Sequence, residues 1–391
     1  MHRLTIRILI PLMLLAFASN SAFAITKAKK KTSVRHAVKA KTVAATRKVT
    51  AAVHQPVSHL SRLRASRKRV YYSPWTEPTF ADSTAGDKID GEDLAVRRAA
   101  VQALGPYNGT IVAVDPQSGR LLTIVNQNLA FKSGFQPCST IKLVAALAGL
   151  NEGLIDRNTG IRVGRRTSMN LTEALARSNN FYFATVGNRL GFEKVEQYAK
   201  LFGLGEKACF EEPEEQSGGL PDAPPAEGGV GMMTSFGSGI TLTPLQLAGL
   251  VTAMANGGTL YYLQHPHTQD EAAHIVPKVK RQLEISQWIP EVKPGMEGAV
   301  EYGTARRASY NANEPIFGKT GTCSDQRSPG VHLGWFGSFN EVNSKKLVVV
   351  VLLTGGHPVN GPVASGVAGA VYRNLSEQGY FGVQTVASLN F

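Results

Sequence analysis

Apolar positions along the chain form two kinds of pattern. Gly109–Val114 and Leu121–Val125 are short, β-branched runs on either side of an Asp-Pro-Gln-Ser-Gly stretch, which predicts a hairpin. Three further strand-like runs come late in the chain and predict an antiparallel meander: residues 317–323, 333–339 and 347–354.

Helical patterns occupy the middle of the chain. Residues 137–153 have Pro near the start and Gly at the end, and residues 143–150 are apolar nearly all round, which predicts a central, buried helix. Strands at both ends with helices between them favour an α+β fold, with an antiparallel sheet of about five strands flanked by helices and a helical subdomain. The other predicted segments are helices at 171–177, 180–190, 244–256 and 363–375 and a loop at 205–231.

The N-terminus has the pattern of an export signal. Arg3 and Arg7 precede an apolar run at 8–18, and Ala22-Phe23-Ala24 fits the small-x-small cleavage rule. The sequence therefore predicts a signal peptide at 1–24, with an uncleaved anchor as the alternative. Export places the protein in the periplasm or on the outer face of the cytoplasmic membrane.

The net charge of +13 is concentrated in one segment. Residues 25–72 hold fourteen Lys or Arg and no acidic residue, whereas the chain from Ser73 on carries 26 of the 42 basic residues and all 29 acidic ones. The folded part is thus mildly acidic, which argues against nucleic acid as a partner. We expect residues 25–72 to be a basic disordered linker, either merely solvated or in electrostatic contact with anionic membrane or wall. A lead-in segment at 73–100 and a domain at 101–391 follow.

Three motifs place candidate catalytic residues. Ser139 begins the buried helix and Lys142 follows one turn later, so a desolvated, neutral Lys142 amine could accept the Ser139 proton. Taken alone, this pair is equally an N-cap serine with an incidental lysine. Ser178 and Asn180 lie between two predicted helices, where a hydroxyl and an amide can face one cleft, or simply stop one helix and cap the next.

The third motif is a run of polar residues in the first strand of the predicted meander. Lys319 and the hydroxyls of Thr320 and Thr322 suit a carboxylate, and Gly321 allows close approach to the strand. The alternative is a polar edge strand.

Together, in this order, Ser-x-x-Lys, Ser-x-Asn and Lys-Thr-Gly resemble the signature of penicillin-binding proteins and serine β-lactamases. Further stretches across about residues 107–378 resemble the transpeptidase domain of penicillin-binding proteins: Gly109–Pro116, Ala174–Phe183, Thr243–Ala248, Gly303-Thr-Ala and Trp335-Phe336.

The resemblance implies a serine D,D-transpeptidase or carboxypeptidase that acts on peptidoglycan stem peptides and is acylated by β-lactams. Ser139 would be the nucleophile, Lys142 its base, Ser178 a proton relay and Asn180 a substrate-positioning amide. Lys319, Thr320, Gly321 and Thr322 would bind substrate, and the backbone N–H groups of Ser139 and Thr322 would form the oxyanion hole. No metal and no organic cofactor is implied.

The chain departs from the family in two places. Only 39 residues separate Ser139 from Ser178, which is short, and Cys138 replaces the usual glycine before the nucleophile. The three cysteines allow at most one internal pair. Because carbapenem-hydrolysing class A β-lactamases, which this pair resembles, have a disulfide at the same two motif positions, we expect Cys138 to pair with Cys323, leaving Cys209 free.

Two other functions use the same fold. A serine β-lactamase would require rapid deacylation through a Glu-positioned water, and the segment Glu212-Pro213-Glu214 superficially resembles such an acidic loop. A β-lactam sensor or scaffold would be acylated without turnover. The sequence leaves transpeptidase and carboxypeptidase activity undistinguished, because that choice depends on whether an amine or water reaches the acyl-enzyme.

Overall fold

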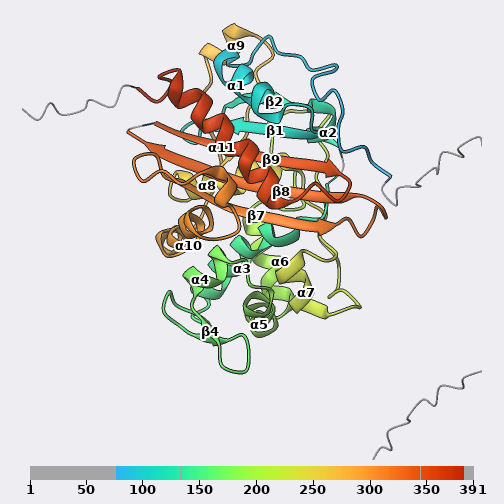
Figure 1. Ribbon diagram of the computed structural model, residues 1–391, viewed down its shortest axis with the longest axis vertical. Coiled ribbons are helices and arrows are strands. Elements are labelled where there is room, and N and C mark those ends of the chain that lie inside the picture. The colour runs from blue at the N-terminus through green and yellow to red at the C-terminus, as the bar shows by residue number, and fades with distance from the viewer. Residues whose placement is uncertain (1–75, 133, 344, 383–391) are drawn as a thin grey trace, which may run out of the picture. The chain divides into compact units, whose positions relative to one another are not determined.

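The computed structural model describes residues 76–132, 134–343 and 345–382 (Figure 1). The predicted signal peptide at 1–24 and linker at 25–72 lie outside these residues. The helices are α1 Leu94–Leu104, α2 Gln127–Phe131, α3 Lys142–Asn151, α4 Leu171–Ala176, α5 Asn180–Leu190, α6 Phe192–Leu201, α7 Gly229–Phe236, α8 Pro244–Ala255, α9 Gln269–Ala273, α10 Ile289–Glu301 and α11 Gly361–Glu377. The strands are β1 Gly109–Val114, β2 Leu121–Val125, β3 Ile161–Arg162, β4 Ser168–Met169, β5 Thr259–Tyr262, β6 Lys278–Gln282, β7 Ile316–Ser324, β8 His332–Val342 and β9 Lys345–Gly355.

Five strands form one antiparallel sheet in the order β2-β1-β9-β8-β7. The predicted hairpin is therefore present as β1 and β2, and the predicted meander is present as β7, β8 and β9, each strand longer than predicted. Strands from the two ends of the domain meet where β1 pairs with β9, with Ile111 opposite Val351. The fold class predicted from the sequence is confirmed. Strand β7, which carries the Lys-Thr-Gly motif, lies at one edge of the sheet, and β2 lies at the other.

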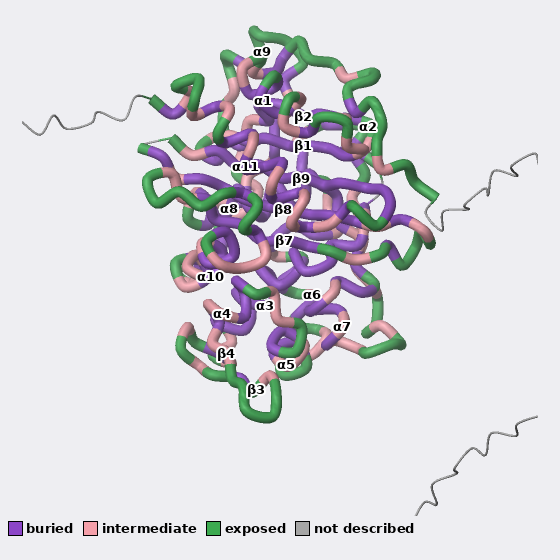
Figure 2. The backbone as a smooth tube through the Cα atoms, viewed as in Figure 1, coloured by how far each residue is buried: buried purple, intermediate pink, exposed green. Residues whose placement is uncertain are grey.

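Side chains alternate across the sheet and supply two separate cores. On one face, Val349 and Val351 pack with α1 and α11, and on the other face Val348 and Val350 pack with α8 and the central helices. Burial of both faces explains why β9 has a continuous apolar run from Leu347 to Leu353 rather than an alternating one. Figure 2 shows the sheet as the most buried part of the backbone.

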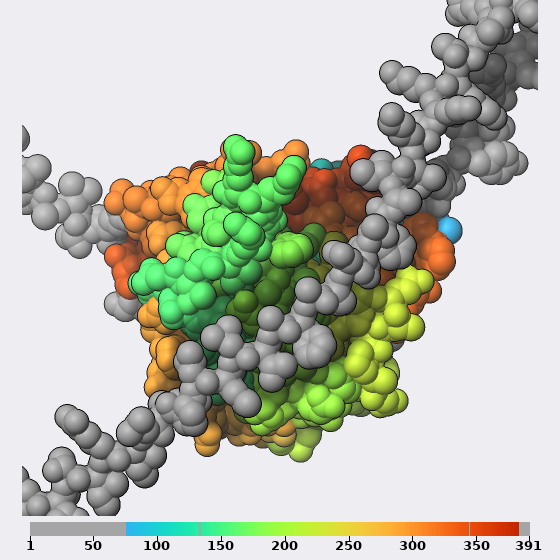
Figure 3. All heavy atoms as spheres, turned by 90° about the horizontal axis from the view of Figure 1, so that it is seen from below, coloured from blue at the N-terminus to red at the C-terminus, as the bar shows by residue number. Residues whose placement is uncertain are grey.

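Helix α3 lies at the centre of the helical region, as the sequence predicts. Every residue of α3 from Lys142 to Leu150 is buried, because α5, α6 and α10 pack around it. The short segment between the first two motifs still carries a small hairpin, formed by the two-residue strands β3 and β4. Seen from below, this segment stands out from the helical region (Figure 3).

The loop predicted at residues 205–231 is irregular up to α7, which begins at Gly229. Helix α1 crosses the predicted boundary between the lead-in segment at 73–100 and the domain at 101–391, and it packs against α11. Within the described part of the chain, none of the helices combines the length and the apolar character that crossing a membrane requires.

Candidate active site

The candidate nucleophile lies on a tight turn that leads directly into the buried helix. Ser139 belongs to a 3-10 helix, Cys138–Ile141, which continues into α3 at Lys142. The preceding residue, Cys138, has a φ of 51°, a left-handed conformation that glycine adopts most readily. This conformation explains why a glycine is usual at that position. The Ser139 side chain is largely buried, and its hydroxyl lies 3.4 Å from the carbonyl of Ser235.

The Lys142 amine is fully buried and touches all three predicted catalytic neighbours. Its Nζ lies 3.0 Å from Ser139 Oγ, 3.1 Å from Ser178 Oγ and 2.6 Å from Asn180 Oδ1, and it also donates to the Ser178 carbonyl at 2.8 Å. The Ser178 carbonyl and Asn180 Oδ1 can only accept hydrogen bonds, so a neutral amine would use both of its N–H groups there. The lone pair is then left for the hydroxyl proton of Ser139.

The electrostatics of the site favour a neutral amine. Burial, together with the nearby charge of Lys319, lowers the pKa of Lys142 to about 6. Burial also lowers the pKa of Lys319 to about 7. Both amines contact the Ser178 hydroxyl, Lys319 at 2.8 Å, so that hydroxyl bridges the two lysines and lies on a path for protons between them.

The second motif occupies the sharp turn between α4 and α5. Ser178 has a φ of 54°, and this left-handed backbone turns both its hydroxyl and its carbonyl toward Lys142. The cap of α5 is Asn179, whose side chain accepts the N–H of Tyr182. Capping is thus assigned to Asn179, and Asn180 contacts Lys142 instead. Both alternatives considered for this motif are therefore present: Asn179 caps a helix, and Ser178 and Asn180 contact the Lys142 amine.

The third motif lies on β7, the edge strand beside the serine turn. Lys319 points to Ser178, whereas the Thr320 hydroxyl lies 2.6 Å from the hydroxyl of Thr304 and is buried. Thr322 is exposed, and its hydroxyl accepts the N–H of Gly361. The structure therefore brings Lys319 into one cluster with Ser139, Lys142, Ser178 and Asn180, and places the two threonine hydroxyls beside other partners along the strand.

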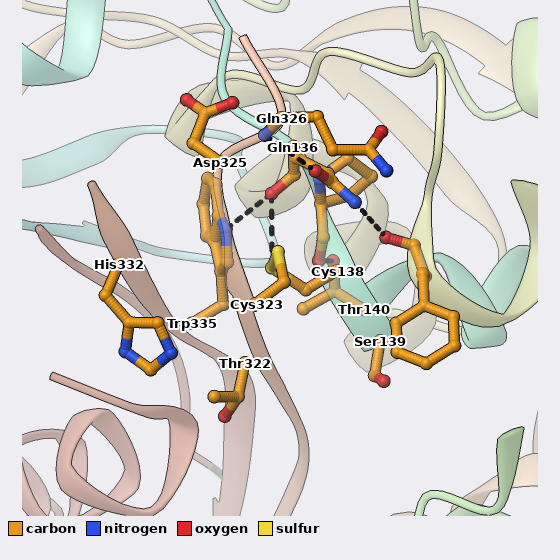
Figure 4. The surroundings of a disulfide bond; sticks show 12 residues. Gln136, Cys138, Ser139, Thr140, Thr322, Cys323, Asp325, Gln326, His332 and Trp335 are labelled. Atoms are coloured by element: carbon orange, nitrogen blue, oxygen red, sulfur yellow. Dashed lines mark hydrogen bonds between the residues drawn. A yellow bond between two sulfur atoms is a disulfide. The ribbon is translucent and has the colours of Figure 1, made fainter. Parts of the chain in front are cut away.

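Close packing of β7 on the serine turn depends on Gly321. A Cβ atom at this position would lie 3.0 Å from the Pro137 carbonyl and 3.2 Å from the Thr140 side chain. Just beyond it, a disulfide joins Cys138 to Cys323, with their Cα atoms 5.6 Å apart, as the resemblance predicts, and Cys209 is unpaired and buried. Figure 4 shows Ser139 and Thr322 on either side of this disulfide.

Breaking this disulfide is expected to destabilise the protein strongly. The bond joins residues 185 positions apart, so the chain-entropy model gives an upper value of about 5 kcal/mol for its contribution to the free energy of unfolding. We expect the double variant Cys138→Ser, Cys323→Ser to lose roughly 2–5 kcal/mol in urea denaturation.

Reductant provides the internal control for that experiment. Dithiothreitol should destabilise the parent protein to the level of the double variant and leave the double variant unchanged. Equal urea midpoints for the parent before and after complete reduction, verified by thiol alkylation, would contradict the prediction.

Acidic residues of the loop that resembles a β-lactamase element have partners other than the serine. Glu215 accepts the backbone N–H groups of Ala208 and Cys209, and the Glu212 carboxylate contacts His265. Within the described part of the chain, Ser139 and Lys142 form hydrogen bonds with serine and asparagine oxygens and with no carboxylate.

Two residues that support the site were not singled out as functional from the sequence. The Thr304 hydroxyl shares a hydrogen bond with the Thr320 hydroxyl. Gln136 anchors the segment before the nucleophile: its side chain donates to the Phe236 carbonyl and accepts the Gln326 N–H. Its backbone carbonyl accepts the indole N–H of Trp335. Figure 4 shows Gln136 at the centre of these contacts. In the sequence, Thr304 could have been noticed because it belongs to the Gly303-Thr-Ala stretch of the family resemblance, whereas Gln136 belongs to no such stretch.

A serine on a turn that packs against the edge of an antiparallel five-stranded sheet, beside a buried lysine at the start of a central helix, is the arrangement of a serine–lysine enzyme. Residues 109–377 match the penicillin binding protein transpeptidase domain, and the chain belongs to this family.

Relatives with known names are similar over the same region. Stage V sporulation protein D of Bacillus subtilis is 28% identical over 313 residues, which cover 70% of this chain and 48% of that protein. The peptidoglycan D,D-transpeptidase MrdA of Haemophilus influenzae is 25% identical over 341 residues, which cover 67% of this chain and 52% of that protein. The chain thus spans about half the length of these relatives.

Solved structures show the same fold. Penicillin-binding protein PBP2 of Pseudomonas aeruginosa superposes with a TM-score of 0.61 at 23% identity, covering 74% of this chain and 77% of that one. The D,D-transpeptidase domain of a peptidoglycan glycosyltransferase from Eggerthella lenta superposes with a TM-score of 0.57 at 18% identity, covering 73% of this chain and 82% of that one.

Proposed function

We propose that the chain is a peptidoglycan D,D-transpeptidase or carboxypeptidase that works through an acyl-enzyme at Ser139. The observation that carries this proposal is the fully buried Lys142 amine, 3.0 Å from Ser139 Oγ and held by two oxygen atoms that can only accept hydrogen bonds. Family membership and the names of the relatives agree with it.

The proposed reaction has two steps, acylation of Ser139 and release of the acyl group. In the first, Ser139 Oγ attacks the carbonyl carbon of the penultimate D-Ala, its proton passes to Lys142, and the terminal D-Ala leaves with a proton relayed through Ser178. In the second, an amine or water attacks the ester, gives up a proton along the same route, and Ser139 regains its hydroxyl hydrogen.

Binding of the substrate uses the edge of the sheet. A stem peptide would lie along β7, with its terminal carboxylate near Lys319 and the hydroxyls of Thr320 and Thr322, and with Asn180 toward a peptide carbonyl. The oxyanion would face the backbone N–H groups of Ser139 and Thr322, which the adjacent disulfide keeps close together. A β-lactam would enter the same position and acylate Ser139.

The proposal also places the protein outside the cytoplasm. The signal pattern at 1–24 and the wall substrate agree on the periplasm or the outer face of the cytoplasmic membrane, and the basic segment at 25–72 would contact anionic lipid or wall polymer. The proposed domain boundaries remain a linker at 25–72, a lead-in at 73–100 and a transpeptidase domain at 101–391.

Incubation with a peptidoglycan stem pentapeptide, with and without an amine acceptor, tests the proposed function. We expect release of D-Ala, and a cross-linked product if the acceptor reaches the acyl-enzyme, while penicillin forms a long-lived adduct. Rapid release of hydrolysed penicillin would instead identify a β-lactamase. A stable adduct without D-Ala release would identify a sensor or scaffold.

A further inference from the structure

Two histidines and a glutamate converge at the sheet edge opposite the candidate active site. Glu212 belongs to the long loop between α6 and α7, and His265 and His267 follow β5, where Gln264 forms a bridge beside the start of β2. Strand β2 is the edge strand farthest from β7 (Figure 1), so this cluster is separate from the serine and its lysines.

One carboxylate oxygen faces both imidazole rings. Glu212 Oε2 lies 3.0 Å from Nδ1 of His265 and 4.0 Å from Nε2 of His267. All three candidate ligand atoms lie within 4.8 Å of one another. A tetrahedral zinc ion, with bonds near 2.1 Å, requires ligand atoms about 3.4 Å apart, so a small adjustment of the cluster would suffice.

The cluster has one exposed member and two buried ones. The side chains of Glu212 and His265 are only 5% and 6% exposed, whereas that of His267 is 54% exposed and can rotate inward. The backbone of the His265 segment is held by bridges on both of its preceding residues, from Leu263 to Cys209 and from Gln264 to Arg120. The largest change needed for closure is therefore expected in the exposed His267 side chain, because Glu212 and His265 already lie 3.0 Å apart.

Burial of the Glu212 carboxylate calls for a compensating cation. Its oxygens contact the His265 ring and, at 3.4 Å, the N–H of Glu214. The nearby Lys207 amine bonds the backbone carbonyl of Glu212 rather than its carboxylate. Within the described ranges, no Lys or Arg forms an ion pair with Glu212. The two imidazoles are thus the only ion-pair partners of this buried carboxylate among the described residues, and a metal ion bound by all three side chains would supply its compensating charge.

We propose that Glu212, His265 and His267 bind a zinc ion, with water in the fourth position. Two imidazoles and one carboxylate suit Zn²⁺, whereas Mg²⁺ and Ca²⁺ prefer oxygen ligands throughout. The ion joins the 205–228 loop to the chain beside β2. This loop leads into α7, whose Ser235 carbonyl lies beside the Ser139 hydroxyl, so the ion stabilises the loop behind the active site and takes no part in the reaction.

Zinc binding is measured by titration calorimetry on the untagged, chelator-treated protein. We expect one ion per chain with a Kd at or below about 1 μM, and a rise in Tm of about 3 °C or more when zinc exceeds the Kd a hundredfold. His267→Ala, a change at an exposed side chain, should weaken binding at least a hundredfold and abolish that rise. His274→Ala is the matched control, because His274 is 75% exposed in the same region, and should bind zinc as the parent does.

Zinc K-edge X-ray absorption identifies the ligands. Only nitrogen and oxygen neighbours are expected, and Glu212→Gln should remove the ordered site. Penicillin acylation should persist in every variant, which separates failure of this proposal from failure of the proposed function. The proposal is overturned if zinc does not bind at 100 μM, if His267→Ala binds as the parent does, or if a sulfur neighbour implicates Cys209.

Discussion

A fluorescent penicillin is expected to label the parent protein covalently and to leave the Ser139→Ala variant unlabelled. The Ser139 hydroxyl lies 3.0 Å from the Lys142 amine, on the turn that packs against Gly321 of β7. Alanine removes this oxygen and keeps the backbone of the turn. We expect a loss of acylation of at least about 10⁴-fold, comparable to the removal of other serine nucleophiles. Mass spectrometry of tryptic peptides should find the adduct on Ser139.

A second serine controls for general damage to the protein. Ser168 is exposed on the small β4 strand, so Ser168→Ala should label at the parental rate. Circular dichroism and Tm should match for all three proteins. Labelling that survives in Ser139→Ala would remove the basis of the proposed acyl-enzyme.

The Lys142→Arg variant is expected to be almost inert toward penicillin although it keeps a positive side chain. An arginine cannot supply a lone pair, because its guanidinium stays protonated at every working pH, whereas burial lowers the pKa of the Lys142 amine to about 6. We expect the acylation rate to fall by at least about 10³-fold.

The pH dependence of the parent protein tests the same point without a mutation. Below pH 6 the Lys142 amine is protonated and its lone pair is lost, so the acylation rate should rise as the pH increases through about 6. Because Lys142 and Lys319 are coupled through Ser178, the measured value belongs to the pair.

Lys194→Arg is the matched control, since this lysine is largely exposed and pairs with Glu152 at the surface. Stopped-flow acylation by a chromogenic β-lactam measures all the rates. A Lys142→Arg protein that reacts within tenfold of the parent, or a parental rate that falls as pH rises from 5 to 7, would exclude a neutral amine base.

Elements with an unambiguous pattern were predictable from the sequence alone. Strands β1 and β2 have the predicted bounds, and α5 runs from Asn180 to Leu190 as predicted. Helix α10, Ile289–Glu301, escaped detection because Pro294 and two glycines oppose a helix locally, while burial of Val292 and Met296 compensates. Two-residue strands such as β3 and β4 are too short to give any pattern.

In the candidate site, contacts between residues close in the sequence were predictable, and contacts between distant residues were not. Ser139 and Lys142 are one turn apart, so their proximity follows from helix geometry. Contacts made across long stretches of chain do not leave a local pattern. Gln136 meets Gln326 across 190 residues, and Glu212 meets His265 across 53. The prediction of no metal followed from the family motifs, which say nothing about that second cluster.

The Cys138–Cys323 bond also makes part of the chain a closed covalent ring. Ser139, Lys142, Ser178, Asn180 and Lys319 all lie inside it. A protease that cuts once in an exposed loop of the ring, such as the segment between β3 and β4, would therefore create a new pair of chain ends without separating the serine from Lys319. The two halves of the catalytic cluster would stay linked through sulfur after such a nick.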